Sequence, residues 1–318
     1  MLTHLRLTVP TALVGDVERL LVEHPYTTNV TVSRGASLKP VGDLVEVDVA
    51  RERAADLLDH LHGIGVSEEG GIVVLRPQGT PFREAERLER LAPGHPDDAV
   101  IWEAVISDAE SAAVPTISYH AFLLIAVALA AIAVVTDSAV LVVGAMVVGP
   151  EFGAIAALSA GLVLRRPRLV GRAARLLLLS FTVAVAAVTL LALLARGAGI
   201  LTAADVLAPR PNTGFIWHPD IWSFVVAVLA GAAGALALAL DRANALVGVF
   251  ISVTTVPAAG NLALGIAIAD VDEINGSLGQ LGLNVAGMVV SGVVVLLVVR
   301  FWWPWLAERS SRLFGHDH

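Results

Sequence analysis

Glu151 is the one acidic residue inside an apolar segment long enough to cross a membrane. A carboxyl group at that depth is costly to bury, and such residues commonly belong to ion or proton pathways. Glu151 directly follows Pro150, and a proline within a helix removes a hydrogen-bond donor and frees the carbonyl four residues earlier. The pair predicts a helix break that carries a protonatable carrier site or a cation ligand. The alternative is a hydrogen-bonded acid with a structural role.

A second apolar segment repeats the proline–glycine motif 107 residues later, with Pro257 and Gly260 at the positions of Pro150 and Gly153. Lipid cannot satisfy the backbone groups that a break frees, so broken helices must face protein or a water-filled cavity. Paired interrupted helices in corresponding halves of a chain are typical of transporter sites. The backbone expected at the two breaks is that of Gly149, Pro150, Gly153, Pro257 and Gly260.

Neutral polar side chains near the second break can complete a site for a solute or an ion. Together with Glu151 the candidates are Thr254, Thr255, Asn261 and Asn284. Hydrogen bonding between helices is the alternative role for these side chains. We expect no metal site and no cofactor, because His60 and His62 lie two residues apart on a helix and point to different sides. No phosphate-binding loop, nucleophile elbow or metalloprotease motif occurs, so we expect no enzyme.

The composition is that of a membrane protein. Hydrophobic residues make up 56% of the chain, and the mean hydropathy of +0.76 is far above that of soluble domains. Cysteine is absent, which excludes disulfides, thiolate catalysis and cysteine-bound metals. The net charge of −8 is concentrated in residues 1–117, where 10 basic and 19 acidic residues give −9. This acidic segment argues against nucleic-acid binding.

Residues 1–77 alternate between the periodicities of strands and helices. Strands are expected over 4–9, 27–33, 43–49 and 71–75, and helices over 15–23 and 51–62. The order βαββαβ predicts a small α+β domain of the ferredoxin-like type. A domain of this size with an open sheet is expected to bind a second copy, which predicts a homo-oligomer; binding of a small regulatory ligand is the alternative. A polar connector with an amphipathic helix fills 78–116.

The rest of the chain predicts an α-helical membrane domain over 117–303 and a cytoplasmic tail over 304–318. Three spans in each half place the halves upside down relative to one another, which predicts an inverted 3+3 repeat. The basic segment 165–175 and the acidic loop 270–273 place both termini in the cytoplasm, and the first residues lack a signal peptide's apolar core. The six expected spans are 117–136, 138–164, 173–195, 221–240, 243–269 and 281–303.

Two stretches resemble the hallmarks of a prokaryotic membrane family called domain of unknown function 389. The first is SAVLVVGAMVVGP at 138–150, and the second is ALVGVFISV at 245–253, which leads to Pro257 and follows AGAAGA at 230–235. The resemblance covers roughly 117–300 and implies an architecture without a known activity. The chain departs from the family at Glu151, where a hydrophobic residue is usual, and at Pro257, where two prolines are usual. A site built on Glu151 would therefore belong to a subgroup.

The leading interpretation is transport or channel conduction of a small solute or ion through a site at the two broken helices. The alternative is a non-transporting membrane sensor or scaffold whose cytoplasmic domain binds a ligand or partner. An intramembrane enzyme ranks third, because Glu151 has no evident second acid, serine–base pair or metal set. The expected partners are the bilayer of the inner membrane, further copies of the chain and a small-molecule or ion ligand.

Overall fold

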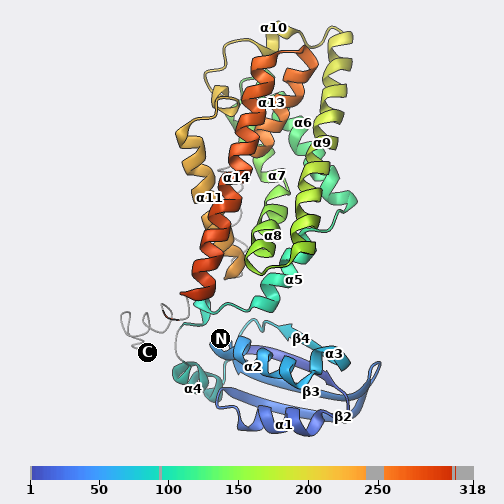
Figure 1. Cartoon of the computed structure of the whole chain (residues 1–318), viewed down its shortest axis with the longest axis vertical. Helices are drawn as coiled ribbons and strands as arrows, with labels where there is room; N and C mark the ends of the chain where they lie inside the picture. The colour runs from blue at the N-terminus through green and yellow to red at the C-terminus, as the bar shows by residue number, and fades with distance from the viewer. Residues whose placement is uncertain (1, 93–94, 241–253, 303–304, 306–318) are drawn as a thin grey trace. The chain divides into compact units, whose positions relative to one another are not determined.

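The computed structural model describes residues 2–92, 95–240, 254–302 and 305 (Figure 1). The described chain forms two compact units, one of residues 2–104 with Trp302 and Trp305 and the other over 105–301, and each has its own hydrophobic core. The expected tail over 304–318 lies outside the described residues apart from Trp305.

The first unit is a four-stranded antiparallel sheet with two main helices. Alternate residues of the central strands, such as Leu5, Leu7, Val45 and Val47, are buried against the helices in one core. The strand order is β2-β3-β1-β4, and together with the element order it is that of a split βαβ unit, as the sequence predicts. The elements are β1 (Leu2–Val9), α1 (Val14–Glu23), β2 (Thr27–Leu38), β3 (Val41–Ala50), α2 (Arg51–Ile64), α3 (Val66–Glu69) and β4 (Gly71–Leu75).

The connector holds α4 (Arg83–Leu91), a 3-10 turn at Pro96–Asp98 and α5 (Trp102–Ala112). The amphipathic helix expected in this connector is α5, which begins after Ile101 has entered the core of the first unit. The division between the two units falls within α5, so this helix carries the chain from one unit into the other.

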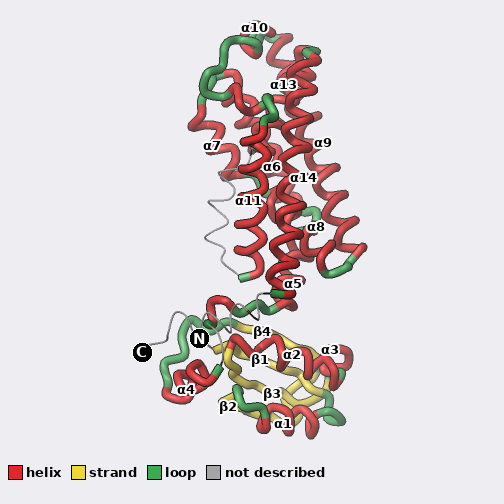
Figure 2. The backbone as a smooth tube through the Cα atoms, turned by 60° about the vertical axis from the view of Figure 1, so that its left-hand side comes forward, coloured by secondary structure: helices red, strands yellow, loops and turns green. Residues whose placement is uncertain are grey.

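The second unit is helical (Figure 2), and four of its described helices are long and apolar enough to cross a membrane. A bent pair of shorter helices raises the number of candidate spans to five. These apolar helices mark a multi-pass membrane protein. The elements are α6 (Ile117–Val135), α7 (Ala139–Val148), α8 (Glu151–Val163), α9 (Pro167–Gly197), α10 (Ala203–Val206), a 3-10 turn at Gly214–Ile216, α11 (Ile221–Ala239), α13 (Thr255–Ile268) and α14 (Val271–Phe301).

The break predicted at Pro150 is present. Helix α7 ends at Val148, α8 begins at Glu151, and the two axes differ by 53°. Pro150 is the residue that precedes the first turn of α8, where a missing N–H costs nothing because the first turn has no intrahelical acceptor for it.

The break predicted at Pro257 and Gly260 is wrong. Helix α13 begins at Thr255 and runs without interruption through Pro257 and Gly260. Pro257 falls in the first turn, where its missing N–H leaves the helix intact. The residues before it that belong to the expected fifth span, 243–253, lie outside the described residues.

Helices α9 and α14 are longer than the sequence indicates. The sequence predicts loops where these helices have their charged first turns, but Pro167 starts α9 and Val271 starts α14. Proline is well suited to the first helical position, and acidic side chains at the start of α14 suit the positive end of the helix dipole. The acidic loop expected at 270–273 is therefore reduced to the connection between α13 and α14.

Helix bounds recur in the two halves of this unit at an offset of 104 residues. Helices α6 and α11 both have 19 residues, and α9 and α14 both have 31. Helices α8 and α13 start at Glu151 and Thr255, which are also 104 residues apart. The counterpart of Pro150 at this offset is Thr254 and not Pro257, because the offset of 107 set by the prolines does not align the helix starts.

The α8–α9 and α13–α14 turns share their backbone conformation at the same offset. Arg165 and Ala269, which follow the ends of α8 and α13, have positive φ angles of 54° and 59°. The next residue in each turn donates its backbone N–H to a glycine carbonyl, that of Gly161 at 2.8 Å and that of Gly265 at 3.0 Å. Left-handed residues are common just after helices but uncommon for these residue types, so the agreement is informative.

Contacts between the halves are reciprocal. Helix α13 packs against α9, and α14 packs against α8. Arg196 on α9 donates to the backbone oxygen of Ala267 on α13, and Arg300 on α14 donates to the backbone oxygen of Val163 on α8. Arg196 and Arg300 are 104 residues apart, and so are Val163 and Ala267, so the two contacts are equivalent in the two halves. Figure 1 shows that α9 and α14 run in opposite directions, from green to yellow and from orange to red.

Candidate functional site

Glu151 and Thr255, the first residues of α8 and α13, meet inside the helical unit. The hydroxyl of Thr255 donates to Oε1 of Glu151 at 2.7 Å, and both residues are buried. The two helix starts direct their positive dipole ends toward this point, which favours negative charge there. Oε2 of Glu151 is buried and has no hydrogen-bond partner among the residues that the structure describes.

Gly149 allows the Glu151 carboxylate to fold back over the break. A Cβ atom at Gly149 would lie 2.4 Å from Oε2 of Glu151 and 2.7 Å from a methyl carbon of Val256. A larger residue at 149 would therefore displace the carboxylate or α13.

Thr254, next to this contact, receives two amide donors from α14. Its hydroxyl oxygen accepts from Nε2 of Gln280 at 2.9 Å and from Nδ2 of Asn284 at 2.8 Å. Oε1 of Gln280 is a second buried oxygen without a partner among the described residues. Buried polar atoms normally have a partner, so each orphaned acceptor is a place where a water, a cation or a donor group fits.

Asn261 belongs to a separate group nearer the end of α13. Its amide donates to Oε2 of Glu273 at 2.6 Å and to Ser277 at 2.8 Å. Arg210, from the loop between α9 and α11, donates to Oδ1 of Asn261 at 2.7 Å and forms an ion pair with Glu273. The side chains of Arg210 and Glu273 are 6% and 3% exposed, so this is a buried charge pair, and Asn261 hydrogen-bonds to both of its members.

One face of α14 connects the Thr254 group to the Asn261 group. This polar face consists of four buried residues, Glu273, Ser277, Gln280 and Asn284. They are four, three and four residues apart, which places them on the same side of the helix, toward α13.

The polar face of α14 begins at a cavity of about 400 Å³. Charged and aromatic side chains line it, and Glu273 and Arg210 belong both to its wall and to the buried network. Its other lining residues include Trp217, His218, Asp270 and Asp272. The guanidinium of Arg210 also lies 5.6 Å from the ring centre of Trp217, which helps to fix its position.

A larger hollow of about 940 Å³ lies along α9, α13 and α14, but its walls are almost entirely apolar. Leu177, Phe181, Val185, Leu262 and Leu281 are typical of its lining. Such a surface suits hydrocarbon and offers little to a polar solute.

The structure divides the predicted site residues into two neighbouring groups. Glu151 bonds to Thr255, Asn284 bonds to Thr254, and Asn261 instead joins the charge pair. Sequence reasoning missed Arg210, Glu273, Ser277 and Gln280. The spacing of the polar face is visible in the sequence, but the acidic residues at its start predict a loop there.

Among the predicted backbone positions, Gly260 allows a close helix contact. A Cβ atom there would lie 2.7 Å from Cβ of Ala130 and from the backbone nitrogen of Ala131 on α6. Gly153 faces Ala112 of α5, where a Cβ atom would meet the alanine methyl at 3.2 Å. Both glycines thus serve helix packing.

The fold defines a multi-pass membrane protein with a broken helix at a buried acid. Residues 146–290 match the model of the family described as Domain of unknown function (DUF389), which confirms the resemblance found in the sequence. The match runs from α7 into α14 and includes Glu151 together with the whole polar face of α14. No curated protein and no solved structure matches the chain.

Proposed function

We propose that the protein transports or conducts a small solute or ion across the membrane through a site at Glu151. The observation that carries this proposal is the buried contact between Glu151 and Thr255 at the starts of two helices, beside two acceptor oxygens that have no partner within the described part of the chain. Acidic residues at membrane depth commonly mark such pathways. Free acceptor oxygens next to a carboxylate favour a cation, or a solute that donates hydrogen bonds.

The proposal includes an inverted 3+3 repeat with its two-fold axis at this site. Glu151 and Thr255 are counterparts at the offset of 104 residues, and they bond to each other. A contact between a residue and its own counterpart lies on the axis that relates two halves. Transporters with inverted repeats bind their substrates at the repeat interface, near the bilayer midplane, between the ends of half-helices.

Access to this site is expected from one side of the membrane in the present conformation. The polar face of α14 leads from the cavity at Arg210 and Glu273 to Thr254, the neighbour of Thr255. The buried pair of Arg210 and Glu273 stands at the start of the route and would have to yield to a passing solute. This arrangement fits a closed state of a gated pathway.

We propose six spans with both termini in the cytoplasm of the cell, so that the cavity faces outward. The basic residues around Arg168 then lie inside and Asp272 lies outside, in agreement with the positive-inside rule. Cysteines can be introduced singly, because the chain has none. A membrane-impermeant maleimide should label Asp272→Cys and spare Arg168→Cys in intact cells, and the reverse result would overturn this orientation.

Flux through reconstituted protein tests the transport proposal. Liposomes with and without the protein are given imposed gradients of H⁺, Na⁺ and K⁺, each followed with an indicator dye. We expect the wild type to dissipate at least one gradient and Glu151→Gln to slow that flux by roughly 10-fold or more, a barrier increase of about 1.4 kcal/mol. The amide keeps the shape of the carboxyl and can still accept from Thr255, so the fold is retained.

Glu110→Gln is the matched control, because Glu110 is an exposed acid of the same unit that pairs with Arg166. Its flux should equal that of the wild type. A Glu151→Gln variant with wild-type flux would remove Glu151 from the mechanism. Wild-type liposomes that retain all three gradients would favour the alternative of a sensor or scaffold.

A further inference from the structure

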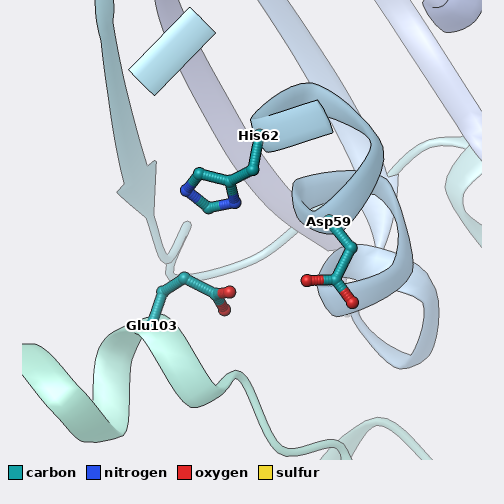
Figure 3. A group of neighbouring side chains, drawn as sticks. All are labelled: Asp59, His62 and Glu103. Carbon is teal, nitrogen blue, oxygen red and sulfur yellow. The ribbon is translucent and has the colours of Figure 1, made fainter. Parts of the chain in front are cut away.

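Three side chains of metal-binding types converge on the surface of the first unit, whereas the proposed transport site belongs to the second unit. Asp59 and His62 lie three residues apart on one face of α2, and Glu103 lies in the first turn of α5. One donor atom from each residue lies within 4.8 Å of the other two. Figure 3 shows the two carboxylates and the imidazole facing the same space.

Glu103 is held in this place by its neighbours in the chain. Ile101 is buried in the core of the first unit, and Ala104 packs against that core. Glu103 lies between these anchors, so its backbone is held beside α2. Oε2 of Glu103 is buried and has no hydrogen-bond partner among the residues that the structure describes. A buried carboxylate oxygen without a donor, close to a second carboxylate, is unfavourable unless a cation is bound.

We propose that Asp59, His62 and Glu103 bind a divalent metal ion of the zinc class. Zinc binds both imidazole nitrogen and carboxylate oxygen in proteins, whereas calcium and magnesium prefer oxygen donors alone. The two carboxylate charges balance the charge of the ion. Zinc lies about 2.0–2.2 Å from such donors, so modest side-chain rotation brings the three atoms to one ion. Three protein ligands leave a fourth position for water.

Bound metal would connect α2 to the start of α5. Helix α5 leaves the first unit after Ala104 and continues into the helical unit from Val105. The ion would therefore fix the first turn of the helix that links the two units, which gives the first unit a means of reporting metal to the membrane domain. This proposal departs from the expectation that there is no metal site, because only the fold brings Glu103 close to His62.

Zinc binding to the full-length protein in detergent tests the proposal. Metal-stripped protein is titrated with Zn²⁺ in competition with a chromophoric chelator. The wild type should bind one ion more tightly than His62→Ala and Glu103→Gln by more than about 10-fold, since even changes outside the ligand set cost that much in known sites. His60→Ala is the matched control, because His60 lies on the same helix and its ring bonds to the backbone oxygen of Asp56.

Two further measurements separate ligand loss from misfolding. Far-ultraviolet circular dichroism of each variant should match the wild type, and Co²⁺ in place of Zn²⁺ should give a visible absorption band that disappears in His62→Ala. Zn²⁺ should also slow amide hydrogen exchange in the first turn of α5. Equal affinities in the wild type and His62→Ala, or an equal loss in His60→Ala, would overturn the proposal and would leave the proposed transport function untouched.

Discussion

The two halves of the helical unit share a backbone plan and differ in the residues that line it. On α9 the buried positions that correspond to the polar face of α14 are Leu169, Ala173, Leu176 and Ser180. On α14 the same positions, 104 residues later, are Glu273, Ser277, Gln280 and Asn284. The contact of α9 with α8 is therefore almost entirely apolar, whereas α14 presents a hydrogen-bonded polar row to α13.

This difference indicates that architecture and chemistry are set by different residues. Small residues and turns with a left-handed residue fix the helix directions, and both halves have them. Polar side chains in a membrane domain are costly, so a row of four on one half alone needs a reason, and the proposed transport route supplies one. Paired substitutions at corresponding positions separate the two contributions.

The largest effect is expected at Glu273. Glu273→Leu gives α14 the residue found at the corresponding position of α9, but it leaves the guanidinium of Arg210 buried without its carboxylate. Breaking a buried ion pair from one side costs about 3–5 kcal/mol, so the detergent-solubilised protein should unfold at a clearly lower temperature. The double variant Glu273→Leu/Arg210→Met should recover most of this loss. A stable single variant would show that the pair contributes little.

The shared turns predict a smaller and symmetrical effect. A Cβ atom at Gly161 would lie 3.1 Å from the backbone nitrogen of Val170, and one at Gly265 would lie 3.2 Å from that of Ile274. Gly161→Ala and Gly265→Ala should therefore each destabilise by about 1–3 kcal/mol, and by similar amounts, in thermal unfolding. Gly144→Ala is the control, since no atom lies within 4 Å of its added Cβ. Clearly unequal losses would argue against a common backbone plan.

The polar row predicts a functional effect on one half alone. Asn284→Leu removes a donor to Thr254 and places an apolar side chain on the proposed route. Flux should fall roughly 10-fold, or about 1.4 kcal/mol in barrier height, whereas Ser180→Ala at the corresponding position of α9 should leave it unchanged. Liposome flux of whichever cation the wild type carries is the measurement. Equal flux losses in both variants would mean that the two halves contribute equally to the route.

The smallest effect is expected from the two arginines that reach across the halves. Arg196 donates to a carbonyl near the end of α13, and Arg300 donates to a carbonyl near the end of α8. Cations are favourable at the C-terminal end of a helix. Arg196→Met and Arg300→Met should each lower stability by about 1 kcal/mol, because the methionine keeps the apolar contact and loses the charged donor. Unfolding temperatures of the two variants should agree closely. If Arg300→Met lowers the unfolding temperature and Arg196→Met does not, the two halves share the geometry of this contact but not its contribution to stability.

The sequence predicted elements best where composition changes sharply at their ends. The spans expected over 117–136 and 221–240 match α6 and α11 to within a residue or two, because each apolar run is bounded by polar residues. Pro150 located the bend between α7 and α8. Where a helix extends into charged residues, as α14 does at Glu273, the boundary was missed because burial of that charge depends on Arg210 from a distant loop.

The amino-acid sequence by itself determined the helical membrane domain, the break at Pro150 and the strand order of the first unit, since apolar periodicity and proline act locally along the chain. Only the tertiary structure decided which polar residues meet. Thr255 reaches Glu151, and Glu103 reaches His62, across long separations in sequence that no local pattern records. Their chemistry depends on distance and on exclusion of water, and both of these properties arise only when the helices have packed.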